Sequence, residues 1–406
     1  AADNTAVFTN TYIAGEIVVD DTDLQFTKVF TGKDWNKENF EFTLTPTGGK
    51  DDEGIEITPQ DVPMPDITKV SVDTPDTTGG NSATFGFGPI TYTQAGVYYY
   101  DVTETNGGTT QNGITYDGRT AKITVTVTDD LNGSLVAHIE KENDTFRNSY
   151  STEVDYDAKG GLSVVKNLTG HAMAQGQFTF HITPADEASA EKAGIDPSGK
   201  EFTNAAAGME NGISTDTMIP LTGLTFTQED SEKTYIYEIR ETGEQAEGYT
   251  NDSTVYTVEI SVSDDGDGVL TVTTTVTPSD GEAQTFVYKN TEETQAPVEL
   301  TFDNLYEAKG TLGGDGEVSL EAAKILNGQN LDEGMFTFLV KDKNENTMTT
   351  GTNMAAADGE QGKIVFDPVT FTTEGLEQAV QDGIAEYKEK DGNRMYIFQY
   401  TVSEDV

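Results

Sequence analysis

Hydrophobic and polar residues alternate with a period of two over much of the chain. Residues 121–129 (AKITVTVTD) and 255–276 (VYTVEISVSDDGDGVLTVTTTV) place apolar or β-branched side chains at every second position, and an acidic, glycine-containing turn interrupts the second stretch. These patterns predict strands, and the second predicts a hairpin. Helical patterns are short, at residues 186–193 and 376–389. Many short strands between Gly/Asp turns predict an antiparallel, immunoglobulin-like β-sandwich.

Three stretches of the chain begin alike and therefore indicate internal repeats. They are LQFTKVFTG with Lys28, LSVVKNLTG with Lys166 and VSLEAAKILNG with Lys324. Each is followed by an aromatic-alternating strand: FEFTL, FTFHI or FTFLV. The first and second Lys are 138 residues apart, and the second and third are 158 apart. The sequence thus contains at least two full tandem repeats of similar length.

Two further shared stretches keep the same order in each repeat. The first is YYYDVTET, YIYEIRET and YIFQYTVSE, which carry Glu104, Glu241 and Glu404. The second has the form aromatic-x-Asn-x-Tyr, and its asparagines are Asn10, Asn148 and Asn304. Because independent markers stay in one register, we divide the chain as a piece of a longer array. Residues 1–19 are the C-terminal strand of a preceding repeat, 20–157 and 158–310 are β-sandwich repeats, and 311–406 are an incomplete third repeat.

Composition narrows the function of these repeats. The 406 residues include 24 Lys and Arg against 71 Asp and Glu, a formal charge of −47, which argues against a protein that neutralises nucleic-acid phosphates. Cys is absent, so disulfides, zinc–thiolate sites and cysteine nucleophiles are excluded. No apolar run approaches the roughly 18 residues of a membrane span. Covalent cross-linking would have to use other side chains.

Charged residues occupy positions of the predicted strands that should face the core. Lys166 shares its strand parity with Leu162 and Val164, and Glu241 shares its parity with Tyr237 and Ile239. Lys28 and Glu104 stand in the same relation to their own apolar neighbours. Burial of lone charges is expensive, so we expect each Lys to be paired with a Glu. The alternative is that the Lys residues protect edge strands and the Glu residues are solvated.

A buried Lys–Glu pair has a specific chemistry. Burial lowers the pKa of Lys and raises that of Glu, so the pair can exchange a proton and leave a neutral, nucleophilic amine. The nearest electrophile in the repeats is the Asn carboxamide of the last strand. Attack of Lys Nζ on Asn Cγ, with Glu moving protons, would release ammonia and form an isopeptide bond.

These repeats resemble the streptococcal-type pilin isopeptide linkage domain of Gram-positive surface proteins. The stretch YEIRETGEQAEGY is similar to the pilin E-box through Tyr237, Ile239, Glu241, Thr242, Gly248 and Tyr249, with one extra residue before the Gly. Glu104 matches the Glu-Thr part alone, and Asp405 follows Glu404 where Thr is usual.

The resemblance implies two cross-linked pairs with a catalytic glutamate each. These are Lys28–Asn148 with Glu104 and Lys166–Asn304 with Glu241. Asn290 is the alternative partner of Lys166, because it lies 49 residues after Glu241, close to the 44 residues between Glu104 and Asn148. We prefer Asn304, since Tyr follows it two positions later.

The third repeat has Lys324 and Glu404 but no aromatic-x-Asn-x-Tyr strand after them, whereas Asn10 has no such Lys before it. Either both missing partners lie outside this stretch of sequence, or Asn10 of one molecule completes the third repeat of another.

We interpret the chain as a non-enzymatic structural module, the stalk or pilus shaft of a Gram-positive bacterium, located outside the cell on the surface or in the cell wall. Its expected partners are neighbouring repeats, and other pilin subunits or a host surface ligand. The competing function is a ligand-binding adhesin that contacts a host protein or glycan through insertions such as residues 51–81 and 194–217. We expect no cofactor or metal: a calcium-loop count from Asp264 reaches Thr275 where Glu is needed.

Overall fold

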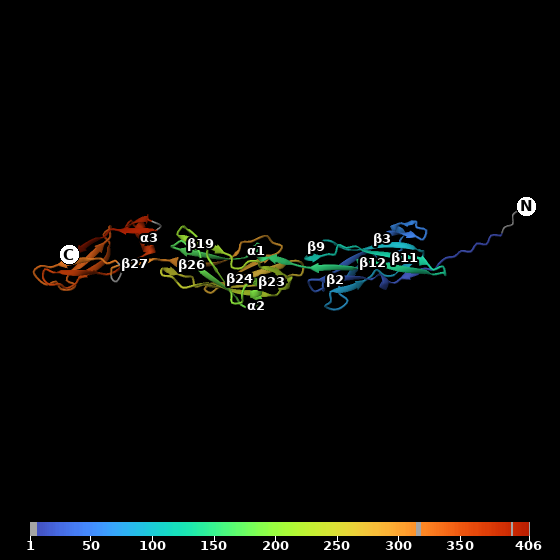
Figure 1. The fold of residues 1–406 in the computed structure, drawn as a ribbon, viewed down its shortest axis with the longest axis horizontal. Coiled ribbons are helices and arrows are strands. Elements are labelled where there is room, and N and C mark those ends of the chain that lie inside the picture. The colour runs from blue at the N-terminus through green and yellow to red at the C-terminus, as the bar shows by residue number, and fades with distance from the viewer. Residues whose placement is uncertain (1–5, 314–317, 391–392, 406) are drawn as a thin grey trace.

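The computed structural model of the chain describes residues 6–313, 318–390 and 393–405. Three successive domains built almost entirely of β-strands follow one another along the longest axis of the molecule (Figure 1). Each domain has its own cluster of buried hydrophobic side chains, and the third cluster is the smallest. The predicted all-β fold of tandem β-sandwich domains is confirmed.

The first domain packs two main sheets against each other. One sheet has the strand order β6 (Ser82–Phe85), β2 (Phe26–Thr31), β13 (Thr145–Tyr150), β10 (Ile114–Thr115) and β9 (Thr110–Gln111). The other has the order β12 (Leu135–Glu142), β11 (Ala121–Asp129), β8 (Gly96–Glu104), β3 (Phe40–Asp51) and β4 (Glu56–Ile57), with β5 (Lys69–Val72) also on β3. A separate pair joins β1 (Ile17–Val19) to β7 (Ile90–Tyr92), and the 3₁₀ turns are η1 (Asp21–Leu24) and η2 (Pro59–Asp61).

The second domain repeats this plan. One sheet has the order β18 (Met209–Glu210), β19 (Ile213–Met218), β15 (Leu162–Thr169), β26 (Val298–Tyr306) and β22 (Tyr249–Thr250). The other has the order β17 (Lys200–Thr203), β16 (Thr179–Pro184), β21 (Thr234–Thr242), β23 (Val255–Asp264), β24 (Leu270–Pro278) and β25 (Gln284–Lys289). The remaining elements are β14 (Glu153–Asp155) paired with β20 (Thr225–Thr227), helices α1 (Tyr156–Lys159) and α2 (Glu187–Ala193), and η3 (Gln228–Asp230).

The third domain is organised differently. Its main sheet has the order β28 (Ala322–Ile325), β31 (Gln361–Phe366), β30 (Thr347–Asn353), β29 (Thr337–Lys341) and β35 (Thr401–Glu404). Two strand pairs and a helix complete it: β27 (Lys309–Leu312) with β32 (Val369–Thr372), β33 (Ala385–Lys390) with β34 (Asn393–Phe398), and α3 (Thr373–Gln381). Residues 314–317, 391–392 and 406 of the predicted third repeat lie outside the described residues.

In both complete domains the first and last long strands are parallel neighbours. β2 pairs with β13 in the first domain, and β15 pairs with β26 in the second. The other ladders of the two domains are antiparallel. The chain therefore enters and leaves each sandwich through two strands that lie side by side.

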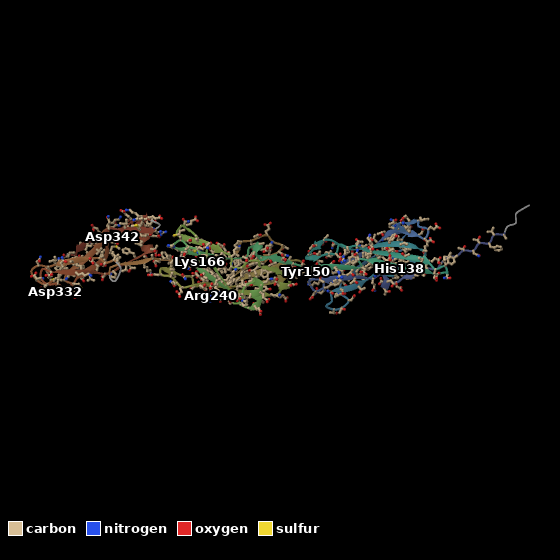
Figure 2. The ribbon with its side chains drawn as sticks, in the orientation of Figure 1. His138, Tyr150, Lys166, Arg240, Asp332 and Asp342 are labelled. Atoms are coloured by element: carbon tan, nitrogen blue, oxygen red, sulfur yellow. The ribbon has the colours of Figure 1, made fainter. Side chains whose placement is uncertain are left out.

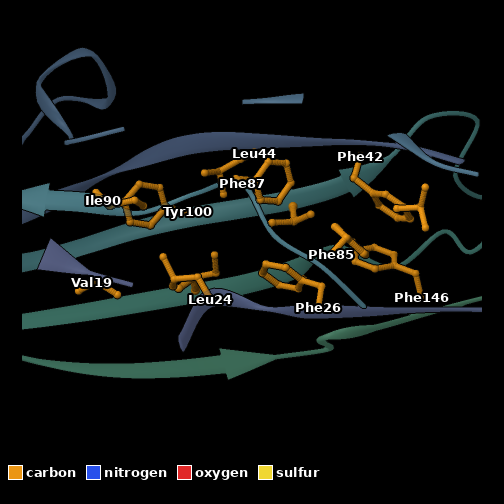
Figure 3. Close-up of a cluster of buried hydrophobic side chains, with 14 of the residues drawn as sticks. Val19, Leu24, Phe26, Phe42, Leu44, Phe85, Phe87, Ile90, Tyr100 and Phe146 are labelled. Atoms are coloured by element: carbon orange, nitrogen blue, oxygen red, sulfur yellow. The ribbon is translucent and has the colours of Figure 1, made fainter. Parts of the chain in front are cut away.

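Aromatic side chains from both sheets fill the core of the first domain (Figure 3). Phe42 of β3 stacks on Phe85 of β6 with ring centroids 4.1 Å apart, and Phe146 of β13 lies 4.9 Å from Phe42. Trp35 is buried at one end, against Phe30 and Phe40. These contacts follow from the strict alternation of the strands, which turns every second side chain inward.

The joint between the first and second domains is a direct contact of one tyrosine with one turn (Figure 2). Tyr150, the last residue of β13, donates a hydrogen bond to Asp264 Oδ1 at 2.6 Å and accepts one from the N–H of Gly268 at 3.2 Å. Lys33 Nζ lies 4.3 Å from the centre of the Tyr150 ring. Gly268 has φ +95°, and a Cβ there would come within 2.7 Å of the Gly113 nitrogen. The two turns touch because neither glycine has a side chain.

A second tyrosine makes the same contact at the other end of the first domain. Residues 6–16 form no strand, but Tyr12 donates to Asp129 Oδ1 at 2.8 Å and accepts from the N–H of Gly133 at 2.9 Å. Residues 1–5 of the predicted preceding strand lie outside the described residues. The strand nearest to this segment, β1, pairs with β7 of the first domain.

Most of the predicted elements are confirmed, and the exceptions are informative. The hairpin at 255–276 is β23–β24, and the helix at 186–193 is α2, capped by Asp186. The helix predicted at 376–389 is wrong in its second half: α3 ends at Gln381 and β33 begins at Ala385. In the segment AEYKE, the backbone hydrogen bonds of β33 to β34 outweigh the local propensity for a helix. The insertions at 51–81 and 194–217 each contribute short strands to the sheets, β4 and β5 in the first and β17, β18 and β19 in the second.

Replacement of the central aromatic residue should destabilise the first domain selectively. Phe42→Ala removes a fully buried ring and should lower the free energy of unfolding of this domain by about 3–5 kcal/mol. Tyr99→Ala is the matched control, because Tyr99 lies on the outer face of β8 and is 38% exposed. Urea unfolding followed by domain-specific NMR signals would test this. An equal effect of both changes would contradict the assigned core.

Candidate functional site

A lysine, an asparagine and a glutamate meet inside the first domain. Lys28 lies on β2 and Asn148 on the neighbouring parallel strand β13, where Asn148 is paired with Phe30. Both side chains point into the core, because alternate residues of the two strands are buried. Glu104 reaches them from β8 in the opposite sheet. Its Oε1 accepts hydrogen bonds from Lys28 Nζ at 2.7 Å and from Asn148 Nδ2 at 2.6 Å.

Burial dominates the electrostatics of this site. The side chains of Lys28 and Glu104 are both 0% exposed, and Lys28 Nζ lies 4.3 Å from the centre of the Phe40 ring. Desolvation lowers the pKa of Lys28 to about 8, although the charge and hydrogen bond of Glu104 act in the opposite direction. Desolvation also raises the pKa of Glu104. The two pKa values move toward each other, which favours proton exchange within the pair.

The asparagine carboxamide is held by an aspartate that the sequence analysis did not single out. Asn148 Oδ1 accepts a hydrogen bond from the backbone N–H of Asp117 at 2.8 Å. The Asp117 carboxylate in turn accepts from the N–H of Arg147 at 2.7 Å and from the Arg119 guanidinium at 2.5 Å. Burial works to raise the pKa of Asp117, but these hydrogen bonds outweigh it and lower the pKa to about 2. The anchored loop aims a hydrogen-bond donor at the carbonyl oxygen of Asn148.

The second domain contains the same arrangement. Lys166 Nζ is 2.7 Å from Glu241 Oε2, and Asn304 Nδ2 donates to Glu241 Oε1 at 2.8 Å. Asn304 Oδ1 accepts from the N–H of Asp252 at 2.6 Å. Desolvation lowers the pKa of Lys166 as well, and its Nζ lies 4.7 Å from the centre of the Phe178 ring. Figure 2 labels Lys166 within this domain.

The alternative asparagine of the second domain has a different environment. Asn290 Oδ1 accepts from the N–H of Leu270 at 3.1 Å, and its Nδ2 donates to the carbonyl of Gly268 at 2.8 Å. Its side chain thus closes the turn next to β24. The structure brings Asn304, and not Asn290, to Glu241.

The aspartates of the two sites share a sequence signal. Asp117 lies four residues before β11, and Asp252 lies three residues before β23. In each domain, the strand that follows the aspartate pairs with the strand that carries the glutamate. In each case the carboxylate accepts the N–H of the residue just before the asparagine, which is Arg147 or Asp303. A comparison of the repeats at this position would have identified them.

The third domain brings together two of the three groups. Lys324 Nζ is 2.6 Å from Glu404 Oε2 and 4.2 Å from the centre of the Phe336 ring. The side chains of Lys324 and Glu404 are 21% and 30% exposed. Asn10 is exposed and lies in the segment before β1 of the first domain, so the structure does not bring it to Lys324.

Each of the first two domains thus contains a Lys–Glu–Asn triad that spans the two sheets of its sandwich. A family model described as FctA, a Spy0128-like isopeptide containing domain, matches residues 24–151 and 162–307. The two matches cover more than half of the chain, which therefore belongs to this family of pilin domains.

Solved structures similar to the chain include streptococcal major pilins. The major pilin protein T-13 of Streptococcus pyogenes is 22% identical with a TM-score of 0.24, and the match covers 72% of this chain and 99% of that one. The T3.2 major pilin of the same species is 18% identical with a TM-score of 0.26, covering 71% and 99%. No curated protein matches the chain. Among the described residues, no helix is sufficiently long and apolar to traverse a bilayer.

The shifted pKa of Lys28 predicts a pH dependence of stability in a chain that cannot cross-link this site. In Asn148→Ala, the folded chain should lose the Lys28 proton near pH 8, whereas the unfolded chain keeps it until about pH 10.4. Between these values the unfolded state binds more protons, so the free energy of unfolding should rise with pH, by about 1–3 kcal/mol. Below pH 8 both states are protonated and this slope vanishes.

The matched control is the double variant Asn148→Ala/Lys28→Met, which keeps the other titrating groups. Urea unfolding of both variants from pH 7 to 10.5 would measure the difference. The interpretation fails if the two variants have the same pH slope.

Proposed function

We propose that the chain is a shaft or stalk module of a Gram-positive surface pilin, whose first two domains each form an internal Lys–Asn isopeptide bond without another enzyme. Membership of the isopeptide-containing pilin family supports the structural role. The observation that carries the cross-link is the contact of one buried glutamate with both reacting groups, at 2.7 Å from Lys28 Nζ and 2.6 Å from Asn148 Nδ2.

The reaction follows from the positions of these groups. Glu104 takes a proton from the Lys28 ammonium, and the neutral amine attacks Cγ of Asn148. The N–H of Asp117, which contacts Asn148 Oδ1 at 2.8 Å, stabilises the negative charge that develops on this oxygen. Glu104 then delivers this proton to the departing nitrogen, and ammonia leaves as the C–N bond of the carboxamide breaks. The new amide nitrogen gives its surplus proton to Glu104, which leaves a neutral isopeptide bond and a protonated Glu104. Glu241 and Asp252 have the same roles for Lys166 and Asn304.

The cross-link has a mechanical consequence. Each bond would join two adjacent parallel strands, one near the entry of the chain into the domain and the other near its exit. Tension along the molecule would pass through the covalent bond and bypass the rest of the sandwich. Because the bond contains no disulfide, reducing agents would not break it. These properties suit an extracellular shaft on the cell surface that other pilin subunits extend.

The mass of the intact chain under denaturing conditions tests the proposal. Each bond removes one ammonia, about 17 Da, so the wild-type chain should be about 34 Da lighter than its sequence mass. Lys28→Ala, Glu104→Ala and Asn148→Ala should each restore one ammonia, and so should Lys166→Ala, Glu241→Ala and Asn304→Ala. The mass deficit of each variant is calculated from the mass of that variant's own sequence.

Two variants serve as controls for the mass measurement. Lys69→Ala changes an exposed lysine of the first domain, and Asn290→Ala changes the alternative asparagine. Both should keep the full deficit. Peptide mapping should recover Lys166 joined to Asn304. An unmodified wild-type mass would refute the cross-links, and a restored ammonia in Asn290→Ala with Asn304→Ala unaffected would reassign the second one.

Single-molecule stretching tests the mechanical role directly. The wild-type chain should show no release of residues 28–148 or 166–304 before rupture. Asn148→Ala should add an unfolding step of about 40 nm, because about 120 residues extend by roughly 3.3–3.6 Å each. Asn304→Ala should add a slightly longer step. Unfolding steps of these lengths in the wild-type chain would contradict transmission of force through the bonds.

A further inference from the structure

The two triads differ in the surroundings of their glutamates. In the first domain, Glu104 Oε1 accepts the hydrogen bonds of both the lysine and the asparagine, while Oε2 is buried without a hydrogen-bond partner among the described atoms. In the second domain the two bonds are divided, because Glu241 Oε2 faces Lys166 and Oε1 faces Asn304. The two sites therefore share their reacting groups but not the environment of the carboxylate that moves the protons.

An additional amide contacts the reacting nitrogen of the second site. Asn304 Nδ2 donates to Glu241 Oε1 at 2.8 Å and also to Asn251 Oδ1 at 3.4 Å. Asn251 directly precedes Asp252, whose N–H contacts the other end of the same carboxamide, at Oδ1 of Asn304. The nitrogen that would leave as ammonia thus has a second acceptor, which the mechanism proposed above does not use.

A cavity of about 160 Å³ adjoins this nitrogen. Glu241 and Asn251 form part of its wall. Its wall also contains three exposed residues of the loop that follows β21, which are Gly243, Glu244 and Ala246. A water molecule needs roughly 10–15 Å³ of such space, so the cavity has room for several waters that hydrogen-bond to its polar wall. It extends from the buried triad toward exposed residues of the domain.

The first domain has a different side chain at this position. Tyr116 directly precedes the aspartate of the first site, the place that Asn251 takes in the second. The Tyr116 ring packs edge-on against Phe40, with ring centroids 6.1 Å apart, and Phe40 is the ring that lies 4.3 Å from Lys28 Nζ. An aromatic side chain therefore replaces the amide beside the first triad.

We propose that Asn251 is a further catalytic residue of the second domain: its carbonyl oxygen receives the leaving nitrogen of Asn304, and the adjoining cavity carries the ammonia to solvent. This inference rests on the isopeptide chemistry proposed above. The bond between Lys166 Nζ and Asn304 Cγ forms, and the bond between Cγ and Nδ2 breaks. Glu241 transfers one proton of the lysine ammonium to Nδ2, which leaves as ammonia, and then accepts the surplus proton of the new amide.

Asn251 binds the departing nitrogen more strongly than it binds the intact carboxamide. In the carboxamide Nδ2 is neutral, and its contact with Asn251 is long. When Nδ2 accepts a proton in the tetrahedral intermediate, it becomes a cationic donor, and hydrogen bonds of charged groups are roughly twice as strong as neutral ones. An interaction that strengthens toward the transition state increases the rate of the reaction.

The cavity acts on the product of the reaction. Ammonia held in a sealed apolar site would lack hydrogen bonds and would stay beside the new bond, where it can attack the carbonyl carbon again and reverse the reaction. In a water-filled cavity the ammonia is hydrogen-bonded and exchanges with solvent. Its escape makes the Lys166–Asn304 bond permanent.

The two bonds of one chain can be timed against each other. The full chain is produced by cell-free synthesis, samples are denatured in acid at intervals, and the cross-linked peptides of both domains are quantified by mass spectrometry. Asn251→Leu keeps the approximate size of the side chain but removes its oxygen. It should slow the Lys166–Asn304 bond about three- to tenfold, the factor of one ordinary hydrogen bond, and leave the Lys28–Asn148 bond unchanged.

Asn167→Leu is the matched control for this kinetic measurement. Asn167 lies on β15 next to Lys166 but on the opposite face of the strand, where it donates to Asp303 at 2.8 Å. This variant should form both bonds at the wild-type rate. Unchanged kinetics in Asn251→Leu, or equal slowing in Asn167→Leu, would overturn the catalytic role of Asn251.

Labelled ammonia tests the cavity itself and decides the question even if Asn251→Leu does not fold. The wild-type chain reacts at alkaline pH in ammonia that carries the heavy isotope of nitrogen, and reversal of a new bond by this ammonia labels the asparagine. Chains that are not yet cross-linked should contain more label in Asn304 than in Asn148. Ala246→Leu narrows the exposed part of the cavity and should reduce the label in Asn304 alone. Equal labelling of the two asparagines in the wild type would overturn the cavity as the route of ammonia.

The intact mass separates this proposal from the one on which it rests. If the wild-type chain lacks the deficit of about 34 Da, the proposed chemistry of both domains fails first. If the deficit is complete and the second bond forms at the same rate with and without the Asn251 oxygen, only the role of Asn251 is refuted.

Discussion

The structure depends on a buried ion pair that spans the two sheets of each complete domain. Lys28 with Glu104, and Lys166 with Glu241, are removed almost entirely from water, and neither member of a pair would be tolerated there alone. The loss of one partner of such a pair typically costs about 3–5 kcal/mol, because the other charge stays buried. The pair therefore fixes the relative position of the sheets and keeps a lysine whose pKa is already lowered next to a carboxamide. One arrangement therefore accounts for the packing of the two sheets and for the close approach of the lysine to the asparagine.

The parallel pairing of the first and last strands determines where the chain enters and leaves each domain. A β-sandwich built only from hairpins would separate its entry and exit strands or place them antiparallel. In this chain β2 and β13 run side by side in one direction, as do β15 and β26, so the domains follow one another in a row. The tyrosine at the end of β13 then reaches the turn of the next domain. Asn148, which contacts Glu104, and Tyr150, which forms the joint, are only two residues apart on the same strand, so the position of the buried triad and the orientation of the next domain depend on one strand.

Much of this organisation could be predicted from residue patterns, because alternation and internal repetition are local properties. The register of Lys, Glu and Asn across the repeats indicated which charged residues face inward, and in the first two domains the structure brings these residues together. Asp117 and Asp252 were not identified from the sequence, because an aspartate that precedes a strand is also a common turn residue. The helix predicted at 376–389 was wrong in its second half, because β33 is held by its pairing with β34. A local helical pattern carries no information about pairing between two segments.

The sequence by itself determined the all-β class, the repetition of one pattern along the chain and the identity of the buried cations and carboxylates. It does so because a period of two assigns each side chain to a face, and a lysine on an apolar face requires a partner. Only the tertiary structure decided that Asn304 and not Asn290 reaches Glu241, that backbone N–H groups point at the asparagine carbonyls, and that β28 has one paired edge among the described residues. These are relations between strands distant in the chain, and their geometry is set by the packing of the two sheets.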